Sequence, residues 1–346
     1  MKTVWYYFFK ILLKTSLFFM SKKIIVNGKK NIPKKGAVLF MVNHPNGLID
    51  PLIVTTNNPR TNYFLTRAAS FKKPIVRWFL NSLNLIPIYR IRDGVQQLNK
   101  NKGVFEKCFN LLDNQKALII FPEGSHDKRR TVRSLSKGFS RIVFGAIERN
   151  PKLQIQLIPV GITYQDSSCY PFKVSLNYGT PILANDFYKS NLHHSDIRKM
   201  KDVISDQLKV LSVHIPLTED YEKWREKLNS ANVDFTKVDE VNSMIQSNII
   251  IKKNKKVNLV KFLKPIIILN SLIPWLLWKY VKNKITDFEF ISTFKFGVGS
   301  LTVIPFFLVN SYIICNLFTL QSSIIYFACS ILILLIYSKF HSTPAR

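Results

Sequence analysis

The chain contains few cysteines and few glycines for its length. Its 346 residues include only 4 Cys and 12 Gly. No two cysteines form a CxxC pair, and two of the four lie in an apolar tail; they are Cys108, Cys169, Cys315 and Cys329. This pattern argues against a disulfide framework and against a zinc site, and it favours a reducing compartment for the charged part of the chain. Low glycine and the absence of a short repeat exclude collagen and simple solenoids.

Acidic residues are scarce as well. The chain has 21 Asp+Glu against 50 Lys+Arg, which gives a formal net charge of +29. Such a charge is typical of proteins that bind nucleic acid, anionic membrane surfaces or anionic small substrates, although a general richness in Lys, Asn and Ile also contributes here. No zinc finger, RRM-type aromatic motif or bZIP pattern is present, which disfavours nucleic acid as a partner. With 47% hydrophobic and 13% aromatic residues, most of the chain is not intrinsically disordered.

Residues 1–21 are strongly apolar but do not have the pattern of a signal peptide. Lys10 and Lys14 interrupt the apolar run, and no small-residue cleavage site follows it. On a helix, Thr3, Lys10, Lys14 and Ser21 fall on one polar stripe, and large apolar side chains cover the remaining surface. We therefore expect an amphipathic helix in the membrane interface; the alternative is a helix docked on the following domain.

Residues 22–215 alternate short apolar runs with amphipathic stretches. The runs predict strands at Ile24–Val26, Ala37–Val42, Tyr63–Leu65, Leu85–Tyr89, Ala117–Phe121, Gln156–Gly161 and Lys173–Tyr178. The stretches between them predict helices near 51–57, 72–83, 94–113, 138–149 and 194–213. This alternation predicts an α/β domain with a largely parallel sheet flanked by helices. In such sheets, sites form at the carboxyl ends of the strands.

The C-terminal part divides into a polar and an apolar region. Residues 216–264 predict a polar helical linker, which carries a basic run of Lys252, Lys253, Lys255 and Lys256. The following residues, 265–346, predict a membrane region. Its first apolar stretch, 265–278, has no charge but is too short to span a bilayer unaided.

Residues 296–338 contain no Asp, Glu, Lys or Arg. A membrane span needs about 20 apolar residues, so this stretch predicts a two-helix transmembrane hairpin with its turn near Asn316–Ser323. Lys295 and Lys339 flank the stretch, which predicts cytoplasmic ends and a catalytic domain on the cytoplasmic side of the membrane. The alternative is a buried helical pair in a soluble protein.

One polar block, residues 43–51, follows a predicted strand and opens a helix. His44 lies directly after the strand, and Asp50 is close enough in the loop to hydrogen-bond the imidazole. An Asp that fixes the tautomer leaves the other ring nitrogen free to take a proton from a hydroxyl. The alternative is structural, because an Asp followed by Pro51 is also a good helix N-cap.

Further polar residues follow two other predicted strands. Arg90 lies just past one strand, where a guanidinium could clamp a phosphate, and Glu123 and Gly124 follow another. A solvated arginine and a charged surface loop are the alternatives. The adjacent His126 and Asp127 leave a metal site as a further possibility.

Four blocks in this order resemble the glycerophospholipid acyltransferase superfamily over roughly residues 24–215. The blocks are Asn43–Asp50, similar to its HxxxxD block, Ile86–Arg90, Phe121–Gly124, similar to its FPEG block, and Ile158–Gly161. Five residues rather than four separate His44 from Asp50. That form, with Ser125-His126-Asp127 after FPEG, is similar to the glycerol-3-phosphate/dihydroxyacetone-phosphate acyltransferase branch, whose members often carry a membrane hairpin.

The resemblance implies an acyl transfer in which His44 is the general base and Asp50 orients it. It implies acyl-CoA or acyl carrier protein as the donor substrate, no metal and no cofactor. It implies substrate-binding roles for five residues: Arg90 at the acceptor phosphate, Glu123 and Gly124 around the acceptor, Lys137 near the phosphate, and Pro159 on the acyl side.

The acceptor stays open among glycerol 3-phosphate, dihydroxyacetone phosphate and lysophosphatidate. Anionic membrane lipids are expected partners, because a basic face attracts and retains them. Two alternatives remain: an acyltransferase for another acceptor, such as an amino-acid or glycan lipid, and a non-enzymatic membrane scaffold. The scaffold explains the charge and the apolar helices but not the four ordered blocks.

Overall fold

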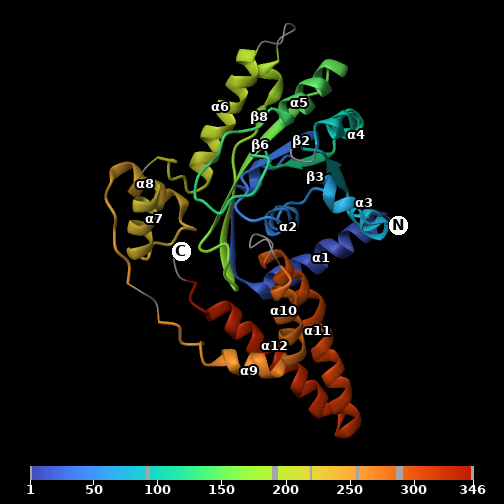
Figure 1. Ribbon diagram of the computed structural model, residues 1–346, viewed down its shortest axis with the longest axis vertical. Helices are drawn as coiled ribbons and strands as arrows, with labels where there is room; N and C mark the ends of the chain where they lie inside the picture. The colour runs from blue at the N-terminus through green and yellow to red at the C-terminus, as the bar shows by residue number, and fades with distance from the viewer. Residues whose placement is uncertain are drawn as a thin grey trace.

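A computed structural model describes residues 2–90, 94–188, 194–218, 220–254, 257–285 and 291–343. Its centre is an eight-stranded sheet flanked by helices on both faces, which confirms the predicted fold class (Figure 1). The strands are β1 (Ser21–Asn27), β2 (Ala37–Val42), β3 (Asn62–Arg67), β4 (Leu85–Ile88), β5 (Ala117–Ile120), β6 (Ile155–Tyr164), β7 (Phe172–Tyr178) and β8 (Ile182–Leu183). All seven predicted strands are present, and only the two-residue β8 was not predicted.

The sheet order is β1-β7-β6-β2-β5-β3-β4, with β8 beside β6. Strands β6, β2, β5, β3 and β4 run parallel to one another. Strands β7 and β8 are antiparallel to β6, and β1 is parallel to β7. The carboxyl ends of β2, β4, β5 and β6 therefore meet at one edge of the sheet, as the sequence predicts.

Helices cover the two faces of the sheet separately. The helices α4 (Asn101–Asp113), α5 (Gly138–Arg149) and α6 (His194–Leu211) pack on the face that receives Leu39 and Met41. The helices α1 (Lys2–Met20) and α2 (Ile49–Thr56) pack on the face that receives Val38 and Phe40. Alternate residues of a strand point to opposite faces, so a strand covered on both sides is apolar throughout, and every residue of β2 is buried.

The N-terminal helix α1 both docks on the domain and presents an apolar surface. Tyr6 and Leu17 are buried, and Lys10 donates to the carbonyl oxygens of Asn58 and Arg60. Its opposite face exposes Val4, Trp5, Tyr7, Phe8, Ile11, Leu12 and Phe18. Beside it lies α3 (Pro74–Ser82), with exposed Ile75 and Trp78, so the two helices form one continuous apolar patch. Such a surface suits a membrane interface.

The region predicted as a polar linker contains α7 (Tyr221–Ser230) and α8 (Val238–Ser247). These helices share a small core of their own, made of Val213, Ile215, Tyr221, Leu228, Ala231, Val233, Phe235, Val238, Val241 and Met244. We name residues 213–250 the α7–α8 unit. Of the predicted basic run, Lys255 and Lys256 lie outside the described residues.

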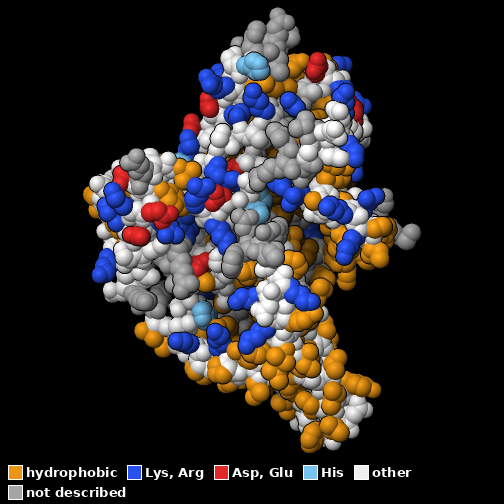
Figure 2. Space-filling view, in the orientation of Figure 1, with side chains coloured by type: hydrophobic (Ala, Val, Ile, Leu, Met, Phe, Trp, Pro, Cys, Tyr) orange, Lys and Arg blue, Asp and Glu red, His pale blue; other side chains and the backbone are white. Residues whose placement is uncertain are grey.

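The C-terminal helices form a hairpin that projects away from the sheet (Figure 1). Two short helices, α9 (Leu263–Asn270) and α10 (Leu272–Asn283), lie against α11 (Ile291–Leu317) and α12 (Leu320–Phe340). The turn between α11 and α12 lies within the predicted range. Only 6% and 11% of their most apolar windows are buried, and both helices are long and apolar enough to cross a membrane. Figure 2 shows the resulting apolar surface, which contrasts with the Lys and Arg side chains over the body of the molecule.

Candidate active site

The side chain of Asn43 fixes the point at which β2 ends. Its amide donates to the carbonyl oxygen of Ile162 at 3.0 Å and accepts from the Ile162 amide at 2.7 Å. These two bonds, together with the backbone bond from the Asn43 amide to the Val160 carbonyl oxygen at 3.4 Å, tie the first residue after β2 to the neighbouring strand β6. His44 is thereby held at the carboxyl edge of the sheet.

The predicted pair of His44 and Asp50 is formed. The Nδ1 atom of His44 lies 2.8 Å from Oδ2 of Asp50, whose side chain is fully buried at the start of α2. The carboxylate also accepts hydrogen bonds from the Asn46 amide at 2.6 Å and from the Tyr164 hydroxyl at 2.7 Å. Asp50 thus closes the loop and holds the imidazole at the same time. It is not the N-cap that its position before Pro51 suggested, because α2 begins at Ile49 and its N-cap residue is Leu48.

Burial sets the protonation state of the pair. It lowers the pKa of His44 to about 3, with the charges of Arg133 and Arg90 acting in the same direction and that of Glu123 opposing them. Burial raises the pKa of Asp50, while the hydrogen bonds from Tyr164 and Asn46 favour its carboxylate form. A carboxylate at Nδ1 holds the ring proton there and leaves a lone pair on Nε2. The neutral imidazole is the form that a general base requires.

The FPEG block packs directly on His44. The ring of Phe121 stacks on the imidazole with centroids 4.0 Å apart, and the ring of His126 lies 5.6 Å away, edge-on. The Asp127 amide donates to the His44 carbonyl oxygen at 2.9 Å. Gly124 has a φ of +74°, a conformation that favours glycine, and its amide closes a turn onto Phe121.

Glu123 binds a cation that the sequence analysis did not select. Its carboxylate accepts hydrogen bonds from the Arg133 guanidinium, and the ion pair measures 2.6 Å. Burial raises the pKa of Glu123, against the effect of Arg133. Arg133 also binds the Ser125 hydroxyl, so Glu123 shapes the site by holding the loop after FPEG in place.

Arg90 contacts the FPEG turn from the end of β4. It follows β4, and its Nη1 donates to the Gly124 carbonyl oxygen at 3.1 Å. Its positive charge contributes to the lowered pKa of His44.

Lys137 and Pro159 lie farther from His44. Lys137 is exposed at the N-terminus of α5, and among the described residues no interaction joins it to the His44 cluster. Pro159 is buried within β6 and pairs with Met41, below the level of His44. It stands between the residues of β6 that pair with β8 and those that pair with β7, where a missing amide costs no ladder bond.

Three residues of the site were missed by the sequence analysis: Asn43 as a clamp, Arg133 and Tyr164. Tyr164 lies at the carboxyl end of β6, next to β2 in the sheet, so knowledge of the strand order would have identified it. Arg133 lies among several cations, and nothing in the sequence distinguishes it from its neighbours. The part of the chain that the structure describes contains no cluster of three or more His, Cys, Asp or Glu residues that could hold a metal ion.

Part of the chain is similar to known acyltransferases. Residues 23–163 match the family model "Acyltransferase". This segment of the chain is similar to that family. Parts of the chain are similar to "Glycerol-3-phosphate O-acyltransferase 2" of Saccharomyces cerevisiae, at 19% identity over 53% of this chain. They are also similar to a "1-acyl-sn-glycerol-3-phosphate acyltransferase" of Borreliella burgdorferi, at 25% identity over 49% of this chain.

These matches cover 39% of the Saccharomyces protein and 62% of the Borreliella protein, so the chain spans less than two thirds of either. Among solved structures, the 1-acyl-sn-glycerophosphate acyltransferase of Thermotoga maritima aligns with a TM-score of 0.44 and 19% identity, over 60% of this chain and 81% of that one.

Proposed function

We propose that this protein is a membrane-bound O-acyltransferase that moves a fatty acyl group from an acyl thioester to a hydroxyl of a glycerol-phosphate-type acceptor. One observation carries the proposal: the 2.8 Å contact between His44 Nδ1 and a buried Asp50 at the sheet edge, with the Arg90 guanidinium close by. The family match over residues 23–163 supports the reaction type.

His44 and Asp50 activate the acceptor. Nε2 of His44 takes the proton of the acceptor hydroxyl as its oxygen attacks the thioester carbonyl carbon. The carbon–sulfur bond then breaks, and the thiolate leaves with the proton that His44 returns. The acyl group passes directly to the acceptor, so no covalent acyl-enzyme is needed. Asp50 stabilises the imidazolium that forms between the two proton transfers, as a carboxylate at Nδ1 does in other His-dependent acyl transfers.

Arg90 binds the acceptor phosphate in this scheme. A guanidinium presents paired donors that match phosphate oxygens, and its contact with Gly124 fixes it against the FPEG turn. Glycerol 3-phosphate, dihydroxyacetone phosphate and lysophosphatidate each carry a phosphate and a free hydroxyl.

The hairpin of α11 and α12 anchors the enzyme in the membrane, where its lipid product is used. We infer that both helices cross the bilayer, with the flanking Lys295 and Lys339 and the catalytic domain on the cytoplasmic side. The excess of Lys and Arg then faces anionic lipid head groups, whose attraction adds about 1 kcal/mol for each residue near the surface.

The test is acyl transfer by the purified protein. The protein is incubated with a labelled acyl donor and each acceptor of a panel that includes amino-acid and glycan lipids, and products are identified by mass. We expect an acylated glycerol phosphate from the wild type and a loss of about 10²–10⁴-fold in His44→Ala, the usual worth of a general base. Unchanged turnover in a folded His44→Ala variant, or no product from any glycerol-phosphate acceptor, would refute the proposal.

A further inference from the structure

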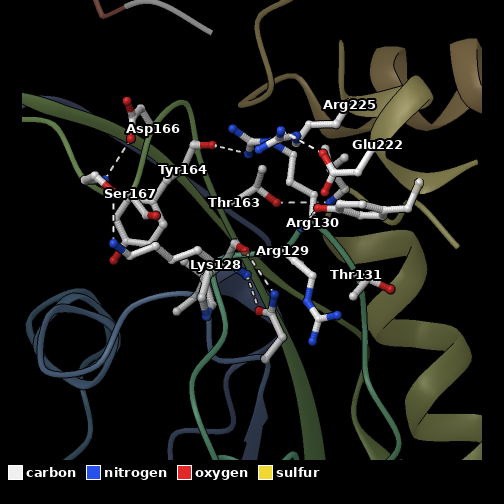
Figure 3. A pocket seen from close by; sticks show the side chains of 16 residues that line it. Lys128, Arg129, Arg130, Thr131, Thr163, Tyr164, Asp166, Ser167, Glu222 and Arg225 are labelled. Atoms are coloured by element: carbon white, nitrogen blue, oxygen red, sulfur yellow. Dashed lines mark hydrogen bonds and ion pairs between the residues drawn. The ribbon is translucent and has the colours of Figure 1, made fainter. Parts of the chain in front are cut away.

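A cavity of about 320 Å³ opens beside the loop that carries His44 (Figure 3). Asn43 and Pro45, the two neighbours of His44, line it, as does Tyr164, whose hydroxyl binds Asp50. Its size lies at the lower end of the range for small-molecule sites, about 300–1,000 Å³. None of the roles given above uses this cavity.

The sheet order places the cavity and Arg90 beside different strands. β2, which precedes His44, stands between β6 and β5. Arg90 follows β4 and binds Gly124 in the loop after β5. The cavity is built on the end of β6 and the residues that follow it, together with residues 128–131 of the same loop after β5. The candidate base therefore stands between two basic regions.

The lining of the cavity is basic. It contains four cations, Lys128, Arg129, Arg130 and Arg225, against two acids, Asp166 and Glu222. The ammonium of Lys128 donates to the Ser168 hydroxyl, and Arg225 forms an ion pair with Glu222 at 2.7 Å. The side chain of Arg225 is 46% exposed, and a pair in solvent is weak enough for a phosphate to compete with it.

The α7–α8 unit provides the outer wall. Tyr221, Glu222 and Arg225 reach the cavity from α7. Figure 3 labels Glu222 and Arg225 on this wall. The wall is firmly attached, because the Arg130 amide donates to the Tyr221 hydroxyl at 2.9 Å.

The side chain of Arg130 makes a second contact, with the core of the α7–α8 unit. The Arg130 guanidinium lies 3.6 Å from the centre of the Phe235 ring and donates to the carbonyl oxygens of Tyr164 and Gln165. Arg130 thus acts as an anchor, and Arg129 is held by a bidentate ion pair with Asp127. This leaves Lys128, from the loop after β5, and Arg225, from α7, as ligands for an anion.

We infer that this cavity binds the phosphate of the phosphopantetheine arm that carries the acyl thioester. The inference rests on the proposed function. Acyl transfer brings two anionic substrates to one base, and Arg90 accounts for the phosphate of only one of them. A donor phosphate held by Lys128 and Arg225 lets the arm run past Pro45 and deliver its thioester to His44 from the side opposite to the acceptor. Coenzyme A and acyl carrier protein share this arm, so the inference covers both sources.

The kinetic test uses Arg225→Ala and Lys128→Ala in the full-length protein. The matched control is Lys223→Ala on the same helix, because Lys223 forms an equivalent pair with Asp220 but does not line the cavity. We expect the KM for the acyl donor to rise roughly tenfold in each cavity variant, the worth of one charge-assisted hydrogen bond, with the acceptor KM and kcat unchanged. The control should match the wild type.

A binding measurement separates this inference from the proposed function. Calorimetric titration with coenzyme A, and separately with holo acyl carrier protein, needs no turnover. Weaker binding of both probes by the cavity variants supports the shared arm, and weaker binding of one identifies that source. Unchanged binding of both in variants that melt like the wild type, or a rise in the acceptor KM in place of the donor KM, overturns the inference. A wild type that binds coenzyme A but transfers no acyl group refutes the function and leaves the cavity assignment standing.

Discussion

At the scale of single residues, the surroundings of the His44 ring determine when it can accept a proton. A histidine in water has a pKa near 6.5, whereas burial lowers that of His44 to about 3. The general base acts in its neutral form, so a lowered pKa moves the loss of activity toward more acidic solution. The ring would then be available throughout the physiological range.

This predicts a flat acid limb. Between about pH 5 and pH 7 we expect kcat to change less than twofold, whereas an ordinary histidine would lose most of its activity over that interval. The measurement is kcat at saturating acceptor, since acceptor phosphates titrate near pH 6 themselves. A fall centred near pH 6.5 would show that His44 has the pKa of an exposed imidazole.

Arg90 gives a second prediction at this scale. Arg90→Ala should raise the KM for a phosphorylated acceptor by about 10–150-fold, the range for a hydrogen bond to a charged group. Arg90→Lys should recover only part of the loss, because an ammonium lacks the paired donors of a guanidinium. Steady-state kinetics with each substrate varied in turn measures both constants. A rise confined to the donor KM would place Arg90 on the wrong side of His44.

Site residues whose contacts lie close together in the sequence could be predicted from it, whereas residues with distant contacts could not. His44 and Asp50 lie six positions apart on one loop, so their contact follows from the strand that precedes them and the helix that follows. The bond from Tyr164 to Asp50 spans 114 positions and depends on which strand lies beside β2. No periodicity encodes strand order, and for this reason Tyr164 could not be selected.

At the scale of elements, apolar runs bounded by polar residues predicted the sheet well. β2 was predicted over the residues that it occupies, since it is buried on both faces and ends at polar Asn43. β8 has two residues, too few to show a pattern, and it forms only because β6 offers a free edge there. The core between α7 and α8 could not be predicted, because its apolar residues are spread singly over several turns of mostly polar helices.

Because α6 packs closely on β6, we predict that Gly161 tolerates no side chain. A Cβ atom on Gly161 would lie 2.1 Å from the carbonyl oxygen of Leu211, at the end of α6. Gly161→Ala should therefore destabilise the fold by about 1–3 kcal/mol, as overpacking does. Gly103→Ala is the control: it lies in α4 with no atom within 4 Å of the new methyl group, and it should stabilise by about 0.5–1 kcal/mol. Thermal unfolding of both variants in detergent compares them, and equal melting temperatures would contradict the close contact.

At the scale of the whole molecule, the hairpin contacts the loop that carries His44. Tyr170 donates to the Ser292 carbonyl oxygen at 2.9 Å, and the Thr293 hydroxyl lies beside Gly47. Phe296 is buried in the same core cluster as α2. The sequence alone indicated that activity would partly survive loss of the hairpin, because all four blocks precede residue 165. These contacts predict a larger loss.

The corresponding test is a variant that ends at Asp287. We expect it to remain on membranes through α1, because interfacial burial and screened charge still act, but to be released by alkaline carbonate or high salt. Its acyl transfer should fall well below that of the full-length protein. Fractionation followed by an activity assay measures both properties, with the full-length protein as the control. Release of the full-length protein by carbonate would show that the hairpin does not span, and a freely soluble variant in low salt would show that α1 does not bind membranes.

The contact between the two ends of the chain has a consequence for biosynthesis. Lys339 of α12 donates to the carbonyl oxygens of Phe18 and Ser21, more than 300 positions earlier. At about 5–20 residues per second, a ribosome completes α12 roughly 15–60 s after α1. During that interval the exposed Phe8 and Ile11 of α1 have only the bilayer to cover them. We therefore expect α1 to reach the membrane before the hairpin does, and the contacts of Lys339 then to hold α1 in place.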